Sequence, residues 1–168
     1  MMLITRLFLA LIFLSIPFHG QPNSGSKQEG KVIGIVDGDT IDCLVNSKII
    51  RVRLNAIDAP EKKQDFYMKS KQALAELCYG KKVILVENGH DRYKRLIADV
   101  YVNDQYINSK MIELGMAWHY TKYSKDRNLS AREHIARINK KGLWSTHFPI
   151  APWDYRASKK SVKVKTAI

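Results

Sequence analysis

Short runs of β-branched and aliphatic residues, each followed by turn-forming residues, make up much of the chain after residue 30. Runs of this length and composition are typical of strands that bury one face. The pattern predicts five strands, at Lys31–Val36, Thr40–Val45, Lys48–Leu54, Lys82–Glu87 and Leu96–Val102. Asp37-Gly38-Asp39 and Asn46-Ser47 separate the first three strands, and Asn88-Gly89 and Asn103-Asp104 predict turns after the last two. We therefore expect a three-stranded meander followed by two further strands.

Three other segments have apolar residues at helical spacing. The first two cover Met68–Tyr79 and Asn108–Leu114, and each is followed by a glycine, a common residue at the end of a helix. The third begins with the capping box Ser130-Ala131-Arg132-Glu133 and ends at Gly142. Strands that come first, with one helix inserted and two trailing, predict an α+β fold in which a partly closed β-barrel packs against helices.

The two ends of the chain differ in composition from the part between them. Residues 1–20 carry one charge, Arg6, ahead of an apolar run that has the length of a signal-peptide core and is too short to cross a bilayer. We expect export, with an uncleaved tether as the alternative. Residues 21–30 are polar and predict a flexible lead into a folded domain at residues 31–156. Residues 157–168 are rich in lysine and predict a disordered, solvated tail.

Charge and cysteine content narrow the function only slightly. The chain has 28 Lys and Arg residues against 16 acidic residues, a formal net charge of +12. This excess favours a polyanionic partner, although solubility alone also explains it. Cys43 and Cys78 are the only cysteines, so one disulfide is permitted, and the alternative is that both are small buried apolar side chains. No Cys-x-x-Cys pair or histidine spacing indicates zinc.

Carboxylates and an arginine gather around two of the predicted chain reversals. The set comprises Asp37 and Asp39 in the first reversal, and Arg53, Asp58 and Glu61 in and after the third strand. An isolated Asp-Gly-Asp-Thr favours an ordinary turn. So many neighbouring carboxylates are costly, however, unless a cation or a phosphate lies among them. With Arg95 ahead of the fifth strand, the set is suited to metal-assisted hydrolysis of a phosphodiester.

Five motifs follow one another in a recognisable order. They are Asp37-Gly38-Asp39-Thr40, Arg53-Leu54 with Asp58-Ala59-Pro60-Glu61, Asp91-Arg92-Tyr93-x-Arg95, Gly115-Met116-Ala117-Trp118 and Gly142-Leu143-Trp144-Ser145. In this order they resemble the staphylococcal nuclease family of calcium-dependent thermonucleases, over roughly residues 31–156. The resemblance implies a five-stranded OB-type β-barrel with three α-helices, which agrees with the pattern of strands and helices above.

The resemblance also implies a metal site. In the family, the aspartates that match Asp39 and Asp58 hold calcium, helped by a backbone carbonyl at the position of Ala59. Many relatives have threonine at that position, and a carbonyl ligand survives the change to alanine. Calcium binds several carboxylate and carbonyl oxygens, which suits two neighbouring reversals. Asp37 resembles a residue that orients the ligands.

Catalytic and substrate-binding residues follow from the same resemblance. Glu61 matches the glutamate that acts as general base on the attacking water or positions it. Arg53 and Arg95 match the two arginines that grip the phosphate, where planar guanidinium groups pair bidentately with phosphate oxygens.

Three further residues belong to substrate binding by the same comparison. Tyr93 matches a tyrosine that contacts the terminal phosphate, and Tyr123 one that packs on the base. Arg92 stands where the family has a lysine, and Lys94 where it usually has a glycine. These changes affect the geometry of the loop and its substrate contacts, not the catalytic set.

Together these observations predict a secreted or periplasmic, Ca²⁺-dependent endonuclease that acts on DNA and RNA. The resemblance implies 3′-phosphate ends, and we expect single strands to be preferred. No stable protein partner and no transmembrane segment in the mature protein are expected. The alternatives are a non-catalytic nucleic-acid-binding OB-type module of the same fold, and an OB-type domain for anionic glycans.

Overall fold

The computed structural model describes residues 25–166, so the predicted signal peptide at residues 1–20 lies outside the described residues. The strands are β1 (Lys27–Asp37), β2 (Thr40–Val45), β3 (Lys48–Leu54), β4 (Ile57–Asp58), β5 (Lys82–His90), β6 (Leu96–Val102), β7 (Gln105–Tyr106) and β8 (Trp118–His119). The helices are α1 (Tyr67–Cys78), α2 (Ile107–Glu113), α3 (Arg127–Ile138) and α4 (Pro152–Thr166), with a 3₁₀ helix, η1 (Gly142–Ser145).

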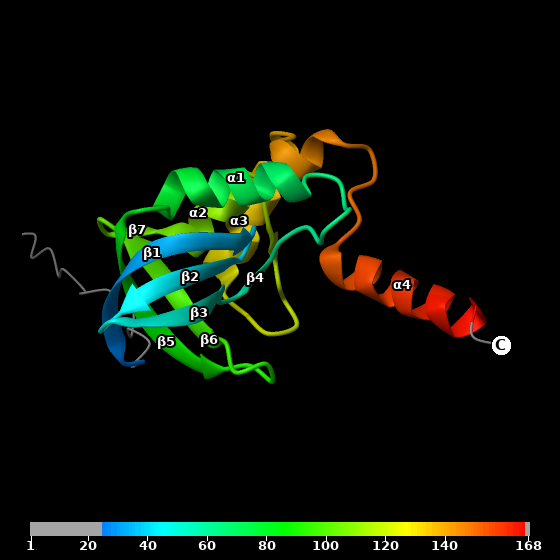
Figure 1. Cartoon of the computed structure of the whole chain (residues 1–168). Helices are drawn as coiled ribbons and strands as arrows, with labels where there is room; N and C mark the ends of the chain where they lie inside the picture. The colour runs from blue at the N-terminus through cyan, green and yellow to red at the C-terminus, as the bar shows by residue number, and fades with distance from the viewer. Residues whose placement is uncertain (1–24, 167–168) are drawn as a thin grey trace, which may run out of the picture.

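Five strands form a barrel beneath α1 (Figure 1). They follow the order β3-β2-β1-β5-β6, and β3 also pairs with β6 in parallel. This last pairing joins Val52 to Leu96 and Leu54 to Ala98, so the sheet closes on itself. The five-stranded OB-type barrel of an α+β fold is therefore confirmed. Closure also brings the end of β3, with Arg53, beside the start of β6, which Arg95 precedes.

β1 is longer than predicted and serves two neighbours. Residues 27–31 pair with β5, and residues 31–37 pair with β2. Register shifts between Val32 and Gly34 and between Ile35 and Asp37 bend the strand where it passes along β2. Residues 27–30, predicted as part of a flexible lead, are thus strand. Ladder hydrogen bonds hold this polar segment, and such bonds leave no apolar pattern in the sequence.

The reversal before β6 comes later than predicted. β5 continues through Asn88-Gly89 to His90, with an irregular register after Glu87. The chain turns instead at Asp91, whose Oδ1 accepts hydrogen bonds from the N–H groups of Tyr93 at 2.8 Å and Arg95 at 3.0 Å. An aspartate that bonds its own following backbone competes well with an Asn-Gly pair as the site of a turn.

The start of α3 also differs from the prediction. The helix begins at Arg127, where the Asp126 carboxylate accepts a hydrogen bond from the Asn128 N–H at 2.7 Å and so caps it. Ser130, the predicted cap, lies within the first turns, and its hydroxyl lies 3.0 Å from Nδ1 of the buried His119. The capping-box pattern therefore predicts this helix correctly but places its start too late in the chain. The helix ends at Ile138, and residues 142–145 form η1.

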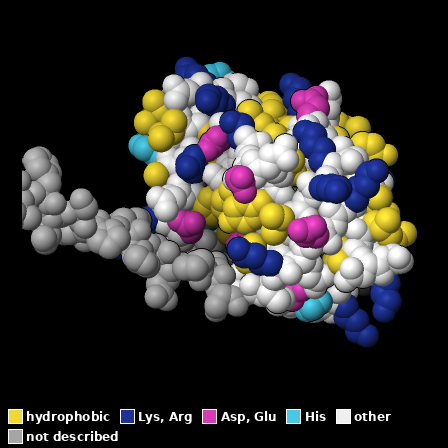
Figure 2. Space-filling model, turned by 90° about the vertical axis from the view of Figure 1, so that its left-hand side faces the viewer, with side chains coloured by type: hydrophobic (Ala, Val, Ile, Leu, Met, Phe, Trp, Pro, Cys, Tyr) yellow, Lys and Arg dark blue, Asp and Glu magenta, His cyan; other side chains and the backbone are white. Residues whose placement is uncertain are grey.

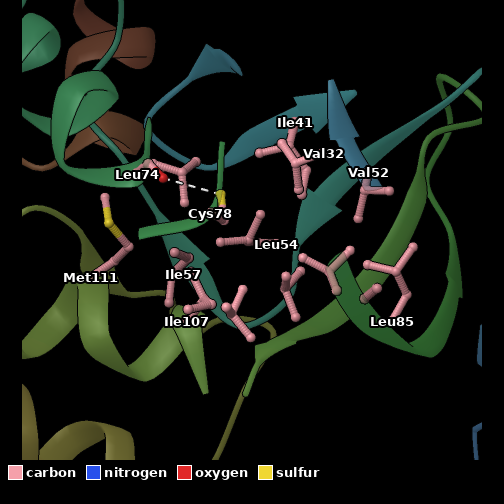
Figure 3. Packing of buried hydrophobic residues seen from close by; sticks show 14 of the residues in the cluster. Val32, Ile41, Val52, Leu54, Ile57, Leu74, Cys78, Leu85, Ile107 and Met111 are labelled. Atoms are coloured by element: carbon pink, nitrogen blue, oxygen red, sulfur yellow. Dashed lines mark hydrogen bonds between the residues drawn. The ribbon is translucent and has the colours of Figure 1, made fainter. Parts of the chain in front are cut away.

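The main core lies between the barrel and helices α1 and α2 (Figure 3). Cys43 and Cys78 are both fully buried in it and are not joined by a disulfide. The Cys78 thiol donates to the Leu74 carbonyl at 3.1 Å, the contact drawn in Figure 3. Burial raises the pKa of both thiols to about 12, so neither carries reactive thiolate at neutral pH. The structure thus supports the small buried apolar role.

A fourth helix, α4, was not expected. Residues 157–166, predicted as a disordered tail, belong to it, and Figure 1 shows it running away from the barrel. Pro152 suits the first helical position because its missing N–H has no helical partner there, and Asp154 in the first turn complements the helix dipole. Solvent exposure, the other part of the prediction, fits residues 157–160. Within residues 25–166, no helix is both long and apolar enough to cross a membrane.

One face of the barrel shows no single basic patch. In Figure 2, Lys and Arg side chains are interspersed with acidic and hydrophobic ones over the face on the left of Figure 1. The candidate site lies elsewhere, beside the beginning of α4, where the ends of β1, β3 and β4 meet.

Two glycines lie where the turn between α2 and β8 packs against the start of η1. We predict that substituting either of them lowers the stability of the fold strongly. Gly115 and Gly142 have φ values of +65° and +51°, and a Cβ on either would overlap backbone oxygens of the other segment. Gly80 has a φ of +73° but open space around it, so a substitution there measures only the cost of the backbone conformation.

We expect Gly80→Ala to lower the free energy of unfolding by about 1 kcal/mol, and Gly115→Ala or Gly142→Ala by about 3 kcal/mol. Urea unfolding of the three variants measures the difference. Equal losses at all three positions would show that the overlap is relieved without cost.

Candidate active site

Backbone pairing on two sides places the aspartates. β2 and β3 are antiparallel neighbours, and across their ends the Leu54 N–H donates to the Asp39 carbonyl at 2.8 Å. Four residues after Leu54, β4 pairs with β8, so that Asp58 lies opposite Trp118. The pairing of β4 with β8 was not predicted, because strands of two residues leave no pattern. It fixes Asp58 at the end of the barrel beside Asp39.

Arg53 joins the two aspartates. Its Nη2 lies 3.0 Å from Asp39 Oδ2 and donates to Asp58 Oδ1 at 2.9 Å, while its Nη1 donates to the Leu54 carbonyl at 2.8 Å. Asp39 Oδ2 also accepts a hydrogen bond from the Ala59 N–H at 2.7 Å. Oxygens from two carboxylates thus converge on one nitrogen atom; the backbone also holds the Asp39 carboxylate, whereas the contacts of Asp58 are with arginine side chains.

Burial makes it costly for the carboxylates of this acidic cluster to carry their charges. Asp58 is only 2% exposed. Burial raises the pKa of its carboxyl, and Asp39 raises it further, although Arg156 and Arg53 act in the opposite direction. Burial and the charge of Asp39 also raise the pKa of Asp37 to about 7. Burial and the neighbouring Asp39 therefore oppose the charged form of Asp58 more strongly than the two arginines favour it.

Glu61 contacts a residue that the sequence analysis did not assign to the site. Arg156 in α4 donates from Nη1 to Glu61 Oε1 at 2.6 Å and from Nη2 to Asp58 Oδ2 at 2.8 Å. It lies 98 positions after Asp58 and at the end of the predicted domain. The only signal was the Pro-Trp-Asp-Tyr-Arg segment at residues 152–156, which has no strand or turn pattern and so gives no sign of long-range contact.

The turn before β6 presents the second predicted arginine. Arg95 Nε donates to Asp91 Oδ2 at 2.6 Å. Its guanidinium carbon lies 5.6 Å from the centre of the Tyr93 ring, and that of Arg92 lies 4.8 Å from the same ring. In the described part of the chain, neither Nη group of Arg95 has a hydrogen-bond partner. Both are available to an anion.

One open cleft of about 880 Å³ brings these residues together. All nine predicted site residues line it, namely Asp39, Arg53, Asp58, Ala59, Glu61, Arg92, Tyr93, Arg95 and Tyr123. Asp37, Tyr120 and Arg156 line it as well. Tyr123 is 70% exposed and meets Tyr120 edge to face, with ring centres 4.8 Å apart. The cleft thus has an acidic floor, arginines and an aromatic wall, whereas the role of each residue remains a prediction.

The donor set is compatible with a hard cation but is small. Between residues 25 and 166, no three side chains of the types His, Cys, Asp and Glu form a group that could hold a metal ion. The predicted ligand set differs from such a group, because it combines two carboxylates with one backbone carbonyl. Asp39 and Asp58 place oxygens within 3.0 Å of Arg53 Nη2, so the two carboxylates are close enough together to share one cation, which in this structure is the guanidinium of Arg53.

Comparison with known proteins agrees with this geometry. A family model described as "Staphylococcal nuclease homologue" matches residues 51–146, more than half of the chain. The chain is 44% identical to a protein of Haemophilus influenzae named "Uncharacterized endonuclease", over 82% of this chain and 78% of that protein. It is 42% identical to "Micrococcal nuclease" of Shigella flexneri, over 79% of this chain and 82% of that one.

A third similar protein is an "Uncharacterized endonuclease" of Escherichia coli, 40% identical over 77% of this chain and 86% of its own length. The family model spans the segment from β3 to η1. This chain therefore belongs to the staphylococcal nuclease homologue family.

Proposed function

We propose that this protein is a calcium-dependent endonuclease that hydrolyses phosphodiester bonds in DNA and RNA and leaves 3′-phosphate ends. Membership of a nuclease family supports the hydrolytic activity, as do the printed names of its relatives. The observation that supports it most strongly is the convergence of the Asp39 and Asp58 carboxylates on one cationic nitrogen of Arg53, inside a cleft that also contains Arg95.

Calcium suits the acidic end of the cleft. Asp39, Asp58 and the backbone carbonyl of Ala59 would hold it, and it accepts irregular sets of carboxylate and carbonyl oxygens more readily than magnesium does. Burial raises the pKa of Asp58 even beside two arginines, so a cation bound among these carboxylates would favour their charged forms. When bound, the ion supplies Lewis-acid stabilisation of charge on a phosphate oxygen.

The arginines are suited to binding the reacting phosphate. Arg95 has both Nη groups available, and its Nε is fixed by Asp91, so the planar fork is oriented before substrate arrives. Arg53 lines the cleft together with Asp39 and Asp58, and its two Nη groups contact the Leu54 carbonyl and these two carboxylates. Bidentate hydrogen bonds from such groups strengthen as negative charge grows on the phosphoryl oxygens in the transition state.

Glu61 is the group that accepts a proton. Its carboxylate lines the cleft close to Asp58, and Pro60 limits the freedom of the backbone before it. Water attacks phosphorus directly while Glu61 takes its proton, and the bond between phosphorus and the 5′ oxygen breaks. The phosphate stays on the 3′ oxygen of the other product, and the departing 5′ oxygen is protonated to a hydroxyl. No covalent intermediate with the protein is needed.

Single strands are the preferred substrate in this proposal. Tyr93 and Tyr123 are 65% and 70% exposed and line the cleft, so their faces can stack on unpaired bases. Stacking accepts any base, which fits low sequence specificity on DNA and RNA alike. The protein acts in the periplasm or outside the cell, a proposal that rests on the signal-peptide composition of residues 1–20 alone.

Metal removal separates catalysis from binding. Excess EGTA should abolish cleavage of a single-stranded oligonucleotide, because the uncompensated carboxylates then repel the phosphate. Binding at low salt should survive, since the basic surface carries it. Calcium should restore cleavage better than magnesium, and Asp39→Asn should need more calcium for the same rate.

A gel assay of cleavage and a filter assay of binding, run on the same samples, measure both effects. Full cleavage in excess EGTA would contradict the metal site. Tight binding without cleavage under any metal condition would favour the non-catalytic module instead.

Arg53→Lys and Arg95→Lys should each lower kcat about 10²-fold or more while the fold is kept, because one ammonium group cannot make two parallel hydrogen bonds to a phosphate. Arg51→Lys is the matched control: Arg51 lies on the same strand as Arg53 but pairs with Asp42 outside the cleft. Steady-state kinetics with circular dichroism of each variant test this. Wild-type rates in both site variants would remove the arginines from the mechanism.

A further inference from the structure

The loop that carries Glu61 is tied to the segment in front of α4. Gln64 makes the connection with its side-chain amide, since Oε1 accepts from the Glu61 N–H at 2.9 Å and Nε2 donates to the Ile150 carbonyl at 2.6 Å. The Gln64 N–H also donates to the Glu61 carbonyl at 2.8 Å. The backbone position of Glu61 therefore depends on a segment 86 residues beyond Gln64.

The side chain of Glu61 depends on the same part of the chain. Arg156 donates from Nη1 to Glu61 Oε1, and it contacts Asp58 with both nitrogens, from Nη2 to Oδ2 at 2.8 Å and from Nη1 to Oδ1 at 3.3 Å. Among the residues that the structure describes, Arg156 is the one partner of the Glu61 carboxylate. The Glu61 side chain is 38% exposed, so without Arg156 only water would compete for its orientation. Arg156 thus holds Glu61 at a fixed position relative to Asp58.

The first turn of α4 is firmly attached to the body of the protein. Trp153 stacks on Tyr120 in the wall of the cleft, with ring centres 5.1 Å apart and planes at 6°. Ala151, just before the helix, is buried in a second apolar cluster with Trp118 and Trp144. Arg156 is therefore presented to the cleft from a fixed base, although the rest of α4 extends away from the barrel.

We propose that residues 150–156 are part of the active site and that Arg156 is a positioning residue that orients Glu61 for catalysis. This inference rests on the proposed function, in which Glu61 accepts the proton of the attacking water. It adds a segment that lies beyond residues 51–146, the range matched by the family model. Arg156 does not itself take up or release a proton.

The expected size of the effect follows from the geometry. A glutamate with no fixed partner samples several rotamers, and misplacing a catalytic group by about 1 Å can cost about 10²-fold in rate. We therefore expect Arg156→Ala to lower kcat by about 10-fold to 10²-fold. KM should change by less than about threefold, because the interaction lost is one that matters in the transition state and not in substrate binding.

A double-mutant cycle tests whether Arg156 acts through Glu61. We would measure kcat and KM on a single-stranded oligonucleotide with saturating calcium for the wild type, Arg156→Ala, Glu61→Gln and the double variant. The loss from Arg156→Ala should shrink to less than about twofold when Glu61 is already Gln. Lys160→Ala is the matched control, since it removes one exposed positive charge from the same helix one turn later, where Lys160 has no contact with the cleft, and it should leave kcat unchanged.

A second variant keeps the test decisive if Arg156→Ala folds poorly, and a chemical rescue extends the test where Arg156→Ala folds. Gln64→Ala removes the side-chain hydrogen bonds that connect the Glu61 loop to Ile150. It should also lower kcat, by a smaller factor than Arg156→Ala. Millimolar guanidinium, far below a denaturing concentration, should partly restore kcat of Arg156→Ala and leave Glu61→Gln unchanged. Circular dichroism and thermal unfolding monitor the fold of each variant.

The outcomes distinguish this inference from the function on which it rests. A wild-type protein that cuts, a slow Glu61→Gln variant and equal losses from Arg156→Ala in both backgrounds would overturn the positioning role alone. A higher kcat in Arg156→Ala would also overturn it, because Arg156 would then obstruct the site. A wild-type protein that never cuts, or a Glu61→Gln variant with normal kcat, would instead refute the proposed mechanism.

Discussion

Two buried carboxylates that share one guanidinium nitrogen set the main constraint on this structure. Asp39 and Asp58 are both almost inaccessible to water, and each lies about 3 Å from Nη2 of Arg53. Placing two such charges side by side is unfavourable unless cations compensate them. The fold supplies Arg53 from the neighbouring strand and Arg156 from α4, and the pKa of Asp58 is still raised. Burial is the largest cause of that raised pKa, so the two carboxylate charges remain costly even beside both arginines.

Strand pairing in the barrel fixes the backbone positions of several of these charged residues. Parallel pairing of β3 with β6 closes the sheet and brings Arg53 close to the turn that carries Arg95. The two-residue pairing of β4 with β8 fixes Asp58, and the aromatic wall of the cleft begins immediately after β8 at Tyr120. Fixed donors and acceptors need little rearrangement when charge develops in the transition state. The site is thus assembled from segments far apart in the sequence, and strand pairing holds those that carry Arg53 and Asp58.

Much of this arrangement can be predicted from the sequence because it depends on local patterns. β2, β3 and β6 have the predicted bounds, since each run of apolar residues is ended by a clear turn. The nine candidate residues line one cleft, and eight of them could be identified because they belong to motifs in a recognisable order, whereas Tyr123 lies outside these motifs. The start of β1 and the cap of α3 were misplaced for physical reasons: ladder hydrogen bonds need no apolar side chains, and Asp126 offers a competing cap.

Arg156 and α4 could not be predicted in the same way. A lysine-rich segment after the last apolar motif has the composition of a disordered tail, and its contacts are made by single side chains across nearly 100 residues. Trp153 stacking on Tyr120 and Ala151 packing beside Trp144 supply the anchoring, and neither contact produces a periodic pattern. Long-range contacts of this kind are visible only once the barrel is closed and β8 is in place.

The most direct test of the central claim is calorimetric titration of calcium into the purified protein without nucleic acid. The account predicts one calcium ion bound per chain, and loss of this binding in the double variant Asp39→Asn/Asp58→Asn, with an unchanged circular dichroism spectrum. The same affinity in the wild type and the double variant, or no binding by a wild type that still cleaves nucleic acid, would show that the two buried aspartates do not form a calcium site.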